Sequence, residues 1–170
     1  MTYDSGIRRT SYIAVVGPGE VDKETYALAV DVGRLIAERG AVLICGGLGG
    51  VMEAAARGVS ERGGSSLGIL PGDDRGQANQ YLTMAIATGL GELRNGLVVG
   101  SSDAVLSVGG SWGTLSEVTL ALRLGMPVVT LRGWSVLDLD GAVIAGVTVA
   151  ASAAEAVNAV LSREGGRKLT

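Results

Sequence analysis

The 170-residue chain has no histidine, one cysteine and two lysines, and each shortage excludes a kind of chemistry. Without histidine there is no histidine metal site, no serine–histidine or cysteine–histidine catalysis, and no imidazole general base. A single cysteine, Cys45, allows neither an internal disulfide nor a thiolate metal cluster. Cys45 ends an apolar run typical of a buried strand, so we interpret it as a small core residue rather than a nucleophile. No metal site is predicted.

Lys23 opens a predicted helix and Lys168 lies in the C-terminal tail, so neither is placed as a Schiff-base lysine in a dry pocket. This placement argues against pyridoxal phosphate chemistry. A net charge of -3 gives no electrostatic reason to expect nucleic acid or an anionic membrane as a partner. No apolar run approaches ~20 residues, and the first residues lack the charged and apolar regions of a signal peptide. The sequence therefore predicts a cytoplasmic protein.

Apolar runs alternate with helical patterns along the chain. Strands are predicted over 12–16, 41–45, 66–70, 82–87, 104–108, 127–131 and 147–150, and helices over 22–39, 51–62, 91–101, 112–124 and 152–161. Strands that are apolar throughout and alternate with helices favour a single-domain, Rossmann-like, doubly wound α/β sheet that is mostly parallel, with helices on both faces. Residues 1–10 are predicted to be a flexible N-terminus, 11–162 a nucleotide- or phosphate-binding domain, and 163–170 a tail.

The stretch 105–117 carries the strongest functional signal. An apolar strand enters a glycine cluster and turns at once into a helix, which leaves unpaired backbone N–H groups at the positive end of the helix dipole. Such an end binds phosphate or another anion, and glycines let the backbone approach the ligand closely. The residues predicted to bind the ligand here are Gly110, Ser111, Trp112, Gly113, Thr114 and Glu117.

Glycines at the ends of the first two strands predict further ligand contacts. Ligands of doubly wound folds lie outside the carboxyl ends of the strands, where strand order reverses. Gly17, Gly46, Gly47 and Gly50 are expected at that edge. The dinucleotide fingerprint is missing, because Asp22 stands where its third glycine should be, and no Walker lysine loop occurs. These absences favour a smaller, mononucleotide-like ligand.

Three motifs in order resemble a known superfamily. They are Gly46-Gly47 with Gly50-Val51-Met52, then Arg94-Asn95, then Gly110-x-x-Gly113-Thr114-x-x-Glu117. Together they resemble the superfamily labelled lysine decarboxylase-like, which includes the lonely-guy cytokinin riboside monophosphate phosphoribohydrolases and the molybdenum cofactor carrier proteins. The resemblance covers about residues 12–160. The lysine placement argues against the decarboxylase label.

Departures from the hydrolase pattern favour the carrier-protein branch. The hydrolases carry Pro-Gly-Gly-x-Gly-Thr-x-x-Glu, whereas here Gly109 replaces the proline and Ser111 the second glycine. The hydrolases also follow the motif arginine with lysine, where this chain has Asn95. Arg94 and Glu117 nevertheless match the hydrolase pattern residue by residue.

Each motif residue has a structural interpretation beside the functional one. Arg94 either clamps a phosphate, pairing with Glu117 in the empty site, or is a solvated helix residue. Glu117 is a favourable anion in a first helical turn, a ligand for ribose hydroxyls, or a catalytic carboxylate that stabilises an oxocarbenium-like transition state. Thr114 is a helix-capping or phosphate-binding residue, and Trp112 a packed or interface aromatic or a surface on which the ligand stacks. Asp73, Asp74 and Asn79 are predicted to be solvated loop residues, with contact to a ligand or metal as the less favoured alternative.

The helices around 93–99 and 112–124 are apolar on nearly every side. One sheet cannot cover such a helix, so part of its surface is expected to meet another subunit. The sequence predicts a homodimer, and the carrier resemblance implies a tetramer.

Two main functions remain, and a small-nucleotide sensor that controls a partner is a weaker third. The first is a binding or carrier protein for a phosphorylated small molecule, either the molybdenum cofactor or a nucleotide, and no cofactor is required. The alternative is a nucleoside 5′-monophosphate phosphoribohydrolase in which Glu117 and Arg94 are catalytic. The departures above favour the first.

Overall fold

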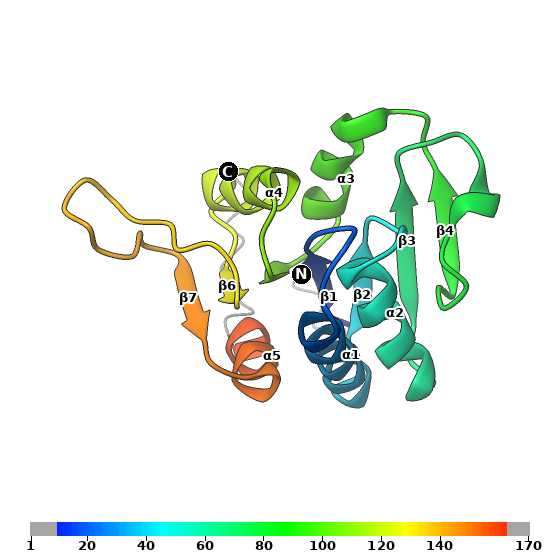
Figure 1. The fold of residues 1–170 in the computed structure, drawn as a ribbon, viewed down its shortest axis with the longest axis horizontal. Helices are drawn as coiled ribbons and strands as arrows, with labels where there is room; N and C mark the ends of the chain where they lie inside the picture. The colour runs from blue at the N-terminus through cyan, green and yellow to red at the C-terminus, as the bar shows by residue number, and fades with distance from the viewer. Residues whose placement is uncertain (1–9, 163–170) are drawn as a thin grey trace, which may run out of the picture.

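A computed structural model of the chain describes residues 10–162, so the predicted N-terminus and tail lie outside the described residues except for Thr10. One seven-stranded sheet runs through the molecule in the order β4-β3-β2-β1-β5-β6-β7, with every pairing parallel (Figure 1). The strands are β1 Tyr12–Val16, β2 Val42–Cys45, β3 Ser66–Leu70, β4 Met84–Ala87, β5 Ala104–Val108, β6 Val128–Leu131 and β7 Val147–Ala150. The predicted α/β, Rossmann-like, doubly wound fold is confirmed.

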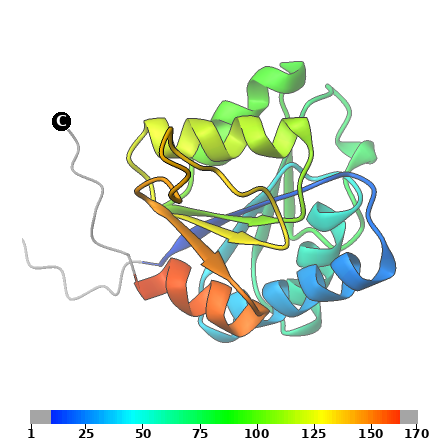
Figure 2. The same ribbon diagram turned by 60° about the vertical axis from the view of Figure 1, so that its left-hand side comes forward.

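The helices form one layer on each face of the sheet. They are α1 Lys23–Glu38, α2 Val51–Glu61, α3 Asn95–Gly100, α4 Trp112–Arg123 and α5 Ala153–Ser162. Figure 2 shows α1 and α5 below the sheet and α3 and α4 above it. Two apolar cores follow from this layering: one beneath α1, α2 and α5, the other beneath α3 and α4.

The centre of the sheet sets the place for a ligand. β1 pairs with β2 on one side and β5 on the other, so the chain winds outward in both directions from this point. The central strands are buried on both faces, and this explains their continuous apolar sequence. The crevice at the carboxyl ends of β1 and β5 is the topological switch point, where ligands of such folds bind.

Helices α1 and α2 cross at two glycines. A Cβ on Gly33 would lie 2.0 Å from the carbonyl oxygen of Ala55, and a Cβ on Gly58 would lie 2.0 Å from that of Val30. Only glycine permits backbones to approach this closely. The two helices therefore form a rigid layer beneath β1 and β2.

Two predicted elements differ from the structure by more than one residue. The helix predicted over 91–101 is a 3-10 turn at Gly91–Arg94 followed by the six-residue α3. Gly91 has φ +57°, outside the right-handed helical region, so a regular helix cannot begin there. The strand predicted over 82–87 begins only at Met84, since Leu82 packs against Gly68 instead of pairing.

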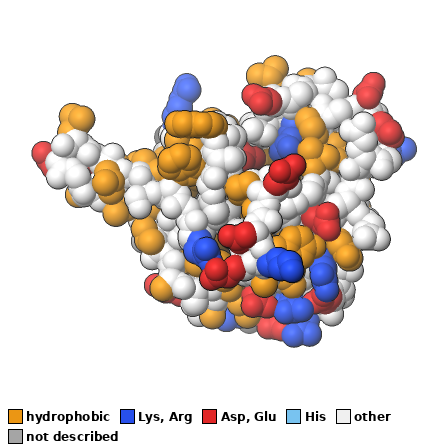
Figure 3. All heavy atoms as spheres, viewed as in Figure 1, with side chains coloured by type: hydrophobic (Ala, Val, Ile, Leu, Met, Phe, Trp, Pro, Cys, Tyr) orange, Lys and Arg blue, Asp and Glu red, His pale blue; other side chains and the backbone are white. Residues whose placement is uncertain are grey.

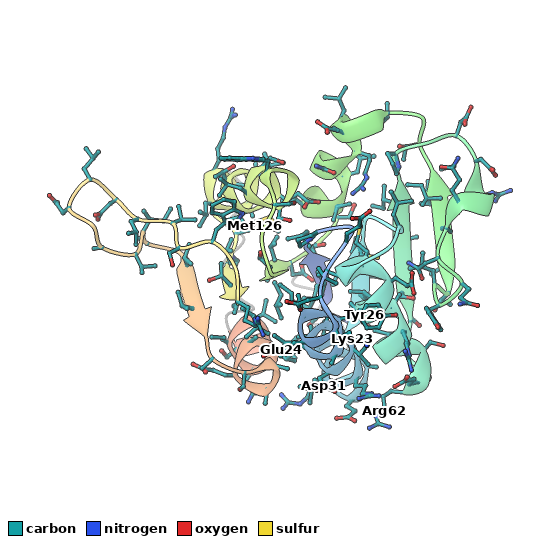
Figure 4. The ribbon with its side chains drawn as sticks, in the orientation of Figure 1. Lys23, Glu24, Tyr26, Asp31, Arg62 and Met126 are labelled. Atoms are coloured by element: carbon teal, nitrogen blue, oxygen red, sulfur yellow. The ribbon has the colours of Figure 1, made fainter. Side chains whose placement is uncertain are left out.

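A protruding segment joins β6 to β7. Residues 133–146, called the arm here, extend away from the sheet beyond α4 and β7 (Figure 1). The ion pair between Arg132 and Glu24 ties the start of the arm to α1. Glu24 lies at the first turn of α1, on the side that faces α5 (Figure 4).

A search of residues 10–162 for membrane-spanning helices finds none of the required length and apolarity. Within the same residues, no three acidic, cysteine or histidine side chains are placed to share a metal ion.

Candidate functional site

A cavity of about 210 Å³ lies at the switch point between β1 and β5. Its floor is the end of β1 and the start of the loop that follows β2, and its walls come from the start of α4 and from the 3-10 turn before α3. The lining residues are Val15, Val16, Gly17, Gly46, Met52, Pro71, Glu92, Arg94, Asn95, Ser111, Gly113, Thr114 and Glu117. Residues far apart in sequence therefore meet at the crevice that the fold provides.

The N-terminus of α4 opens onto this cavity. Ser111 caps the helix, since its Oγ accepts a hydrogen bond from the Thr114 N–H at 3.2 Å and lies 2.9 Å from Thr114 Oγ1. The cap leaves the N–H groups of Trp112 and Gly113 without an acceptor inside the helix. These two donors and the helix dipole favour an anion at the mouth of the cavity.

Arg94 places a buried cation opposite that helix end. Its residue is 8% exposed, and a Cβ on Gly46 would lie only 2.4 Å from Arg94 Nη1. Gly46 is therefore required for the guanidinium to lie flat against the loop after β2. Arg94 Nε is buried without a hydrogen-bond partner, one of two such side-chain atoms in the described part of the chain. Buried donors are normally paired, so an orphaned one indicates an absent acceptor.

Glu117 faces Arg94 in a loose ion pair. Arg94 Nη1 lies 3.9 Å from Glu117 Oε1, beyond hydrogen-bond distance, and Glu117 is 7% exposed. Burial raises the pKa of Glu117 to about 7, and the positive charge of Arg94 offsets only part of this effect. Burial also lowers the pKa of Arg94, with Glu117 opposing the shift. The pairing that the sequence predicted for the empty site is present.

Cys45 lies beneath this pair at the end of β2. It is fully buried, and burial raises the pKa of its thiol to about 11. A thiol with that pKa stays protonated near neutral pH and is a poor nucleophile. Its interpretation as a core residue agrees with this environment.

Seven of the predicted ligand-binding residues line the cavity: Gly17, Gly46, Arg94, Ser111, Gly113, Thr114 and Glu117. The other four, Gly47, Gly50, Gly110 and Trp112, lie next to it without lining it. Gly50 has φ +63°, and a Cβ there would lie 2.2 Å from the carbonyl oxygen of Pro18. Gly47, with φ +80°, packs its Cα against β3 and the side chain of Leu70. For these two glycines, the structure shows a packing reason.

Two supporting residues were not foreseen as such. Trp134, from the arm, donates from Nε1 to the Ser111 carbonyl at 3.0 Å and packs on Gly110, where a Cβ would lie 2.8 Å from Nε1. Its ring centroid is 5.5 Å from that of Trp112, which is 79% exposed. The interpretation of Asn79 as merely solvated is wrong. Its Nδ2 donates to the carbonyls of Gly47 and Leu48 at 3.3 and 3.1 Å, which braces the loop after β2.

Several known proteins resemble this chain over most of its length. An uncharacterized protein of Archaeoglobus fulgidus is 47% identical over 150 residues, which cover 88% of this chain and 94% of that protein. The molybdenum cofactor binding protein from Rippkaea orientalis is 36% identical, with a TM-score of 0.82 and coverage of 91% of this chain and 98% of that one. The molybdenum cofactor carrier protein of Chlamydomonas reinhardtii is 35% identical, with a TM-score of 0.81 and the same coverage.

A more distant similarity concerns the fold alone. DNA processing protein A from Helicobacter pylori is 16% identical, with a TM-score of 0.68, and the similarity covers 89% of this chain and 80% of that one.

The family model of the SLOG cluster4 family matches residues 10–162, the whole described range. Together with the molybdenum cofactor carrier proteins among its structural neighbours, this match shows that the chain belongs to the SLOG cluster4 family.

Proposed function

We propose that this protein binds and carries a phosphorylated small molecule, either the molybdenum cofactor or a nucleotide. The observation that carries the proposal is the buried Arg94 with an orphaned Nε, facing the capped N-terminus of α4 across a cavity at the switch point. A buried guanidinium without a full set of acceptors is costly, and a phosphate supplies those acceptors with matching geometry.

The lining residues fit a phosphate group. Arg94 provides the charge, the uncapped N–H groups of Trp112 and Gly113 at the start of α4 are free to donate to an anion, and Thr114 adds a hydroxyl. The cavity is smaller than the ~300 Å³ of ordinary ligand pockets. It therefore holds the phosphate and the group next to it, and the remaining ring system lies outside, against the exposed indole of Trp112.

The similar proteins support cargo of this kind. Two of them are named for binding or carrying the molybdenum cofactor, and in each case the similarity to this chain covers 98% of that protein's length. In this proposal the molybdenum is part of the bound cofactor, so the protein has to hold only the organic part of the cofactor and its phosphate. The acidic net charge and the low identity to the DNA-processing protein support a small molecule rather than nucleic acid.

The second candidate is a phosphoribohydrolase, and one observation favours it. A carboxyl with a pKa of about 7 is protonated in a large fraction of molecules at neutral pH, so Glu117 can give a proton to a departing base. Its ionised form can stabilise the positive charge that develops on the ribose. Arg94 would then position the phosphate.

One incubation separates the two candidates. The purified protein is mixed with AMP, binding is measured by calorimetry, and free adenine is measured by chromatography. Saturable binding without adenine supports the carrier. Adenine release that Glu117→Gln abolishes supports the hydrolase. Arg94→Gln is expected to weaken AMP binding at least about tenfold, whereas Arg39→Gln, an exposed arginine outside the cavity, leaves it unchanged. Binding that survives Arg94→Gln contradicts both functions.

We also propose that α3 and α4 meet a second copy of the chain. Leu93 is 80% exposed, Leu97 44% and Leu124 49%, which leaves a large apolar surface over the two helices. A homodimer buries this surface, and a tetramer repeats the contact. Light scattering of the purified protein tests this, and a monomer at micromolar concentration contradicts it.

A further inference from the structure

The arm is a preformed hairpin rather than an open loop. Leu137 and Val143 form an antiparallel bridge, and the Asp138 N–H donates to the Ala142 carbonyl at 2.8 Å. Asp138 Oδ1 accepts hydrogen bonds from the N–H groups of Asp140 and Ala142 at 2.9 Å each. The Asp138 side chain therefore closes the turn. Because the turn is already ordered, little conformational entropy remains to be lost when the arm binds a partner.

This hairpin presents apolar side chains to solvent. Leu139, at the turn, is 107% exposed, Leu137 is 51% exposed and Val143 is 46% exposed. Figure 3 shows hydrophobic side chains along the arm and an acidic one at its tip, and the arm projects from the rest of the surface. Large apolar side chains on a rigid protrusion are typical of a surface that inserts into a partner.

The base of the arm contacts the candidate site. Trp134 donates to the Ser111 carbonyl and packs on Gly110, so the arm supports the loop that caps α4. At the other end of the arm, Gly146 lies against the side chain of Leu122 on α4. The arm therefore leaves the molecule beside α4 and next to residues 110–114, called the ligand loop here.

We propose that the arm clasps α4 of a second copy of this chain, in a two-fold dimer, and that this contact holds the ligand loop in place through Trp134. The proposal extends the α3 and α4 contact described above and rests on it. A two-fold axis beside α4 brings each arm to the other copy's α4, so two identical contacts form at once. No other protein is needed to cover either surface.

Charge complementarity favours a second copy of this chain as the partner of the arm. The only ionisable side chains of the arm are Asp138 and Asp140, both acidic. The outer surface of α4 carries one exposed ionisable side chain, Arg123, beside the exposed Leu124. Arg123 has no ion-pair partner among the described residues of its own chain. An acidic, leucine-tipped hairpin thus matches a helix end that offers one arginine among leucines.

The opposite edge of the sheet is a less suitable receptor. β4 also exposes apolar side chains, with Met84 54% and Ile86 51% exposed. The neighbouring loop carries Asp73 and Asp74, and the next turn carries Glu92, which repel an acidic arm. This edge therefore supplies the control for the test.

The test measures the dimer dissociation constant by analytical ultracentrifugation. Leu139→Ser is expected to weaken the dimer at least about tenfold, and Ile86→Ser, an exposed apolar side chain on β4, to leave it unchanged. Arg123→Asp and Asp140→Arg are each expected to weaken it. The double variant restores most of the affinity because the pair is re-formed with its charges exchanged. All four positions are exposed, so circular dichroism should find each variant folded.

Several outcomes would contradict the contact between the arm and α4 of the second copy, called the clasp here. Leu139→Ser with wild-type dimer affinity shows that the arm is not in the contact. A double variant no better than its single parents shows that Arg123 and Asp140 do not pair. Weakening by Ile86→Ser places the contact at β4. A monomeric wild type overturns the dimer and the clasp together.

The coupling to the ligand loop has its own measurement. AMP affinity is expected to fall severalfold in Leu139→Ser at a concentration where the wild type is dimeric, although Leu139 is outside the cavity. Equal AMP affinity in the two proteins overturns the coupling. Absence of AMP binding in the wild type counts against the proposed ligand, and the charge-exchange experiment still decides whether the arm clasps α4.

Discussion

The two helical layers of this protein present chemically different surfaces to water: one is charged and the other is apolar. Over α1 and α2, ion pairs link Arg34 to Asp31 and Glu61, and further pairs join Arg57 to Glu61 and Arg62 to Glu38. Figure 3 shows blue and red side chains crowded over this layer, and Figure 4 labels two of them, Asp31 on α1 and Arg62 directly after α2. Over α3 and α4, exposed leucines and Trp112 replace them.

This difference indicates that the α1 and α2 layer is a scaffold and that the α3 and α4 layer is the working layer, where binding takes place. The α1 and α2 layer meets water with charged side chains and closes its inner contact with glycines at the helix crossing. The α3 and α4 layer contains the buried Arg94 and Glu117 pair, an open helix N-terminus and an uncovered apolar exterior. Unsatisfied polar groups and exposed apolar surface concentrate where a protein binds something.

Gly58→Ala is the strongest test of the scaffold layer. The new Cβ would lie 2.0 Å from the Val30 carbonyl oxygen, so α1 and α2 must separate, and the free energy of unfolding should fall by about 3 kcal/mol or more. Gly96→Ala in α3 is the matched control. A Cβ there meets nothing within 4 Å, and the substitution should stabilise by about 0.5 kcal/mol. Chemical denaturation measures both, and equal effects would contradict the comparison.

Glu117 should make stability depend on pH in the working layer. The pKa of its carboxyl is raised from 4.5 to about 7 in the folded protein, so the folded state keeps a proton that the unfolded chain releases between these values. The stabilisation is complete below pH 4.5 and is lost as pH rises through 7. It amounts to about 3 kcal/mol.

Denaturation curves across this range, for the wild type and Glu117→Gln, measure the effect. The glutamine variant cannot titrate at this position, so its stability should fall less between pH 4.5 and 8. Parallel curves for the two proteins would mean that Glu117 ionises normally.

Much of this arrangement could be predicted from the sequence, and particular residues show why. The parallel, doubly wound sheet follows from apolar runs alternating with helices, and the loop from Gly110 to Thr114 follows from glycines placed between a strand and a helix. The pairing of Arg94 with Glu117 was predicted because both belong to motifs at the same sheet edge. These are local patterns or motif matches.

The role of Trp134 could not be predicted in this way. It lies 23 residues after Ser111 and contacts it only because the base of the arm lies beside the ligand loop. Asn79 braces Gly47 across 32 residues. The break at Gly91 depends on a positive φ that no periodicity records. Long-range contacts and individual backbone angles lie outside what hydrophobic patterning determines.

Trp134→Phe should have an intermediate effect. The substitution keeps an aromatic ring against Trp112 but removes the hydrogen bond from Nε1 to the Ser111 carbonyl, so stability should fall by about 1 kcal/mol. Thermal unfolding measures the loss. A variant as stable as the wild type would show that the arm does not support the ligand loop.

Arg34→Ala should have the smallest effect. Arg34 bridges Asp31 and Glu61 at the surface, where water and salt screen the charges. The loss of stability should be below that of Trp134→Phe and should shrink further at about 1 M salt. An effect as large as that of Gly58→Ala would mean that ion pairs, rather than the glycine crossing, hold the scaffold layer together.

A crystal structure of the protein with AMP would show whether the cavity binds phosphate. We expect the phosphate between Arg94 and the N-terminus of α4, with an oxygen accepting a hydrogen bond from Arg94 Nε and the adenine outside the cavity near Trp112. Ligand density elsewhere, with this cavity holding only water, would contradict it.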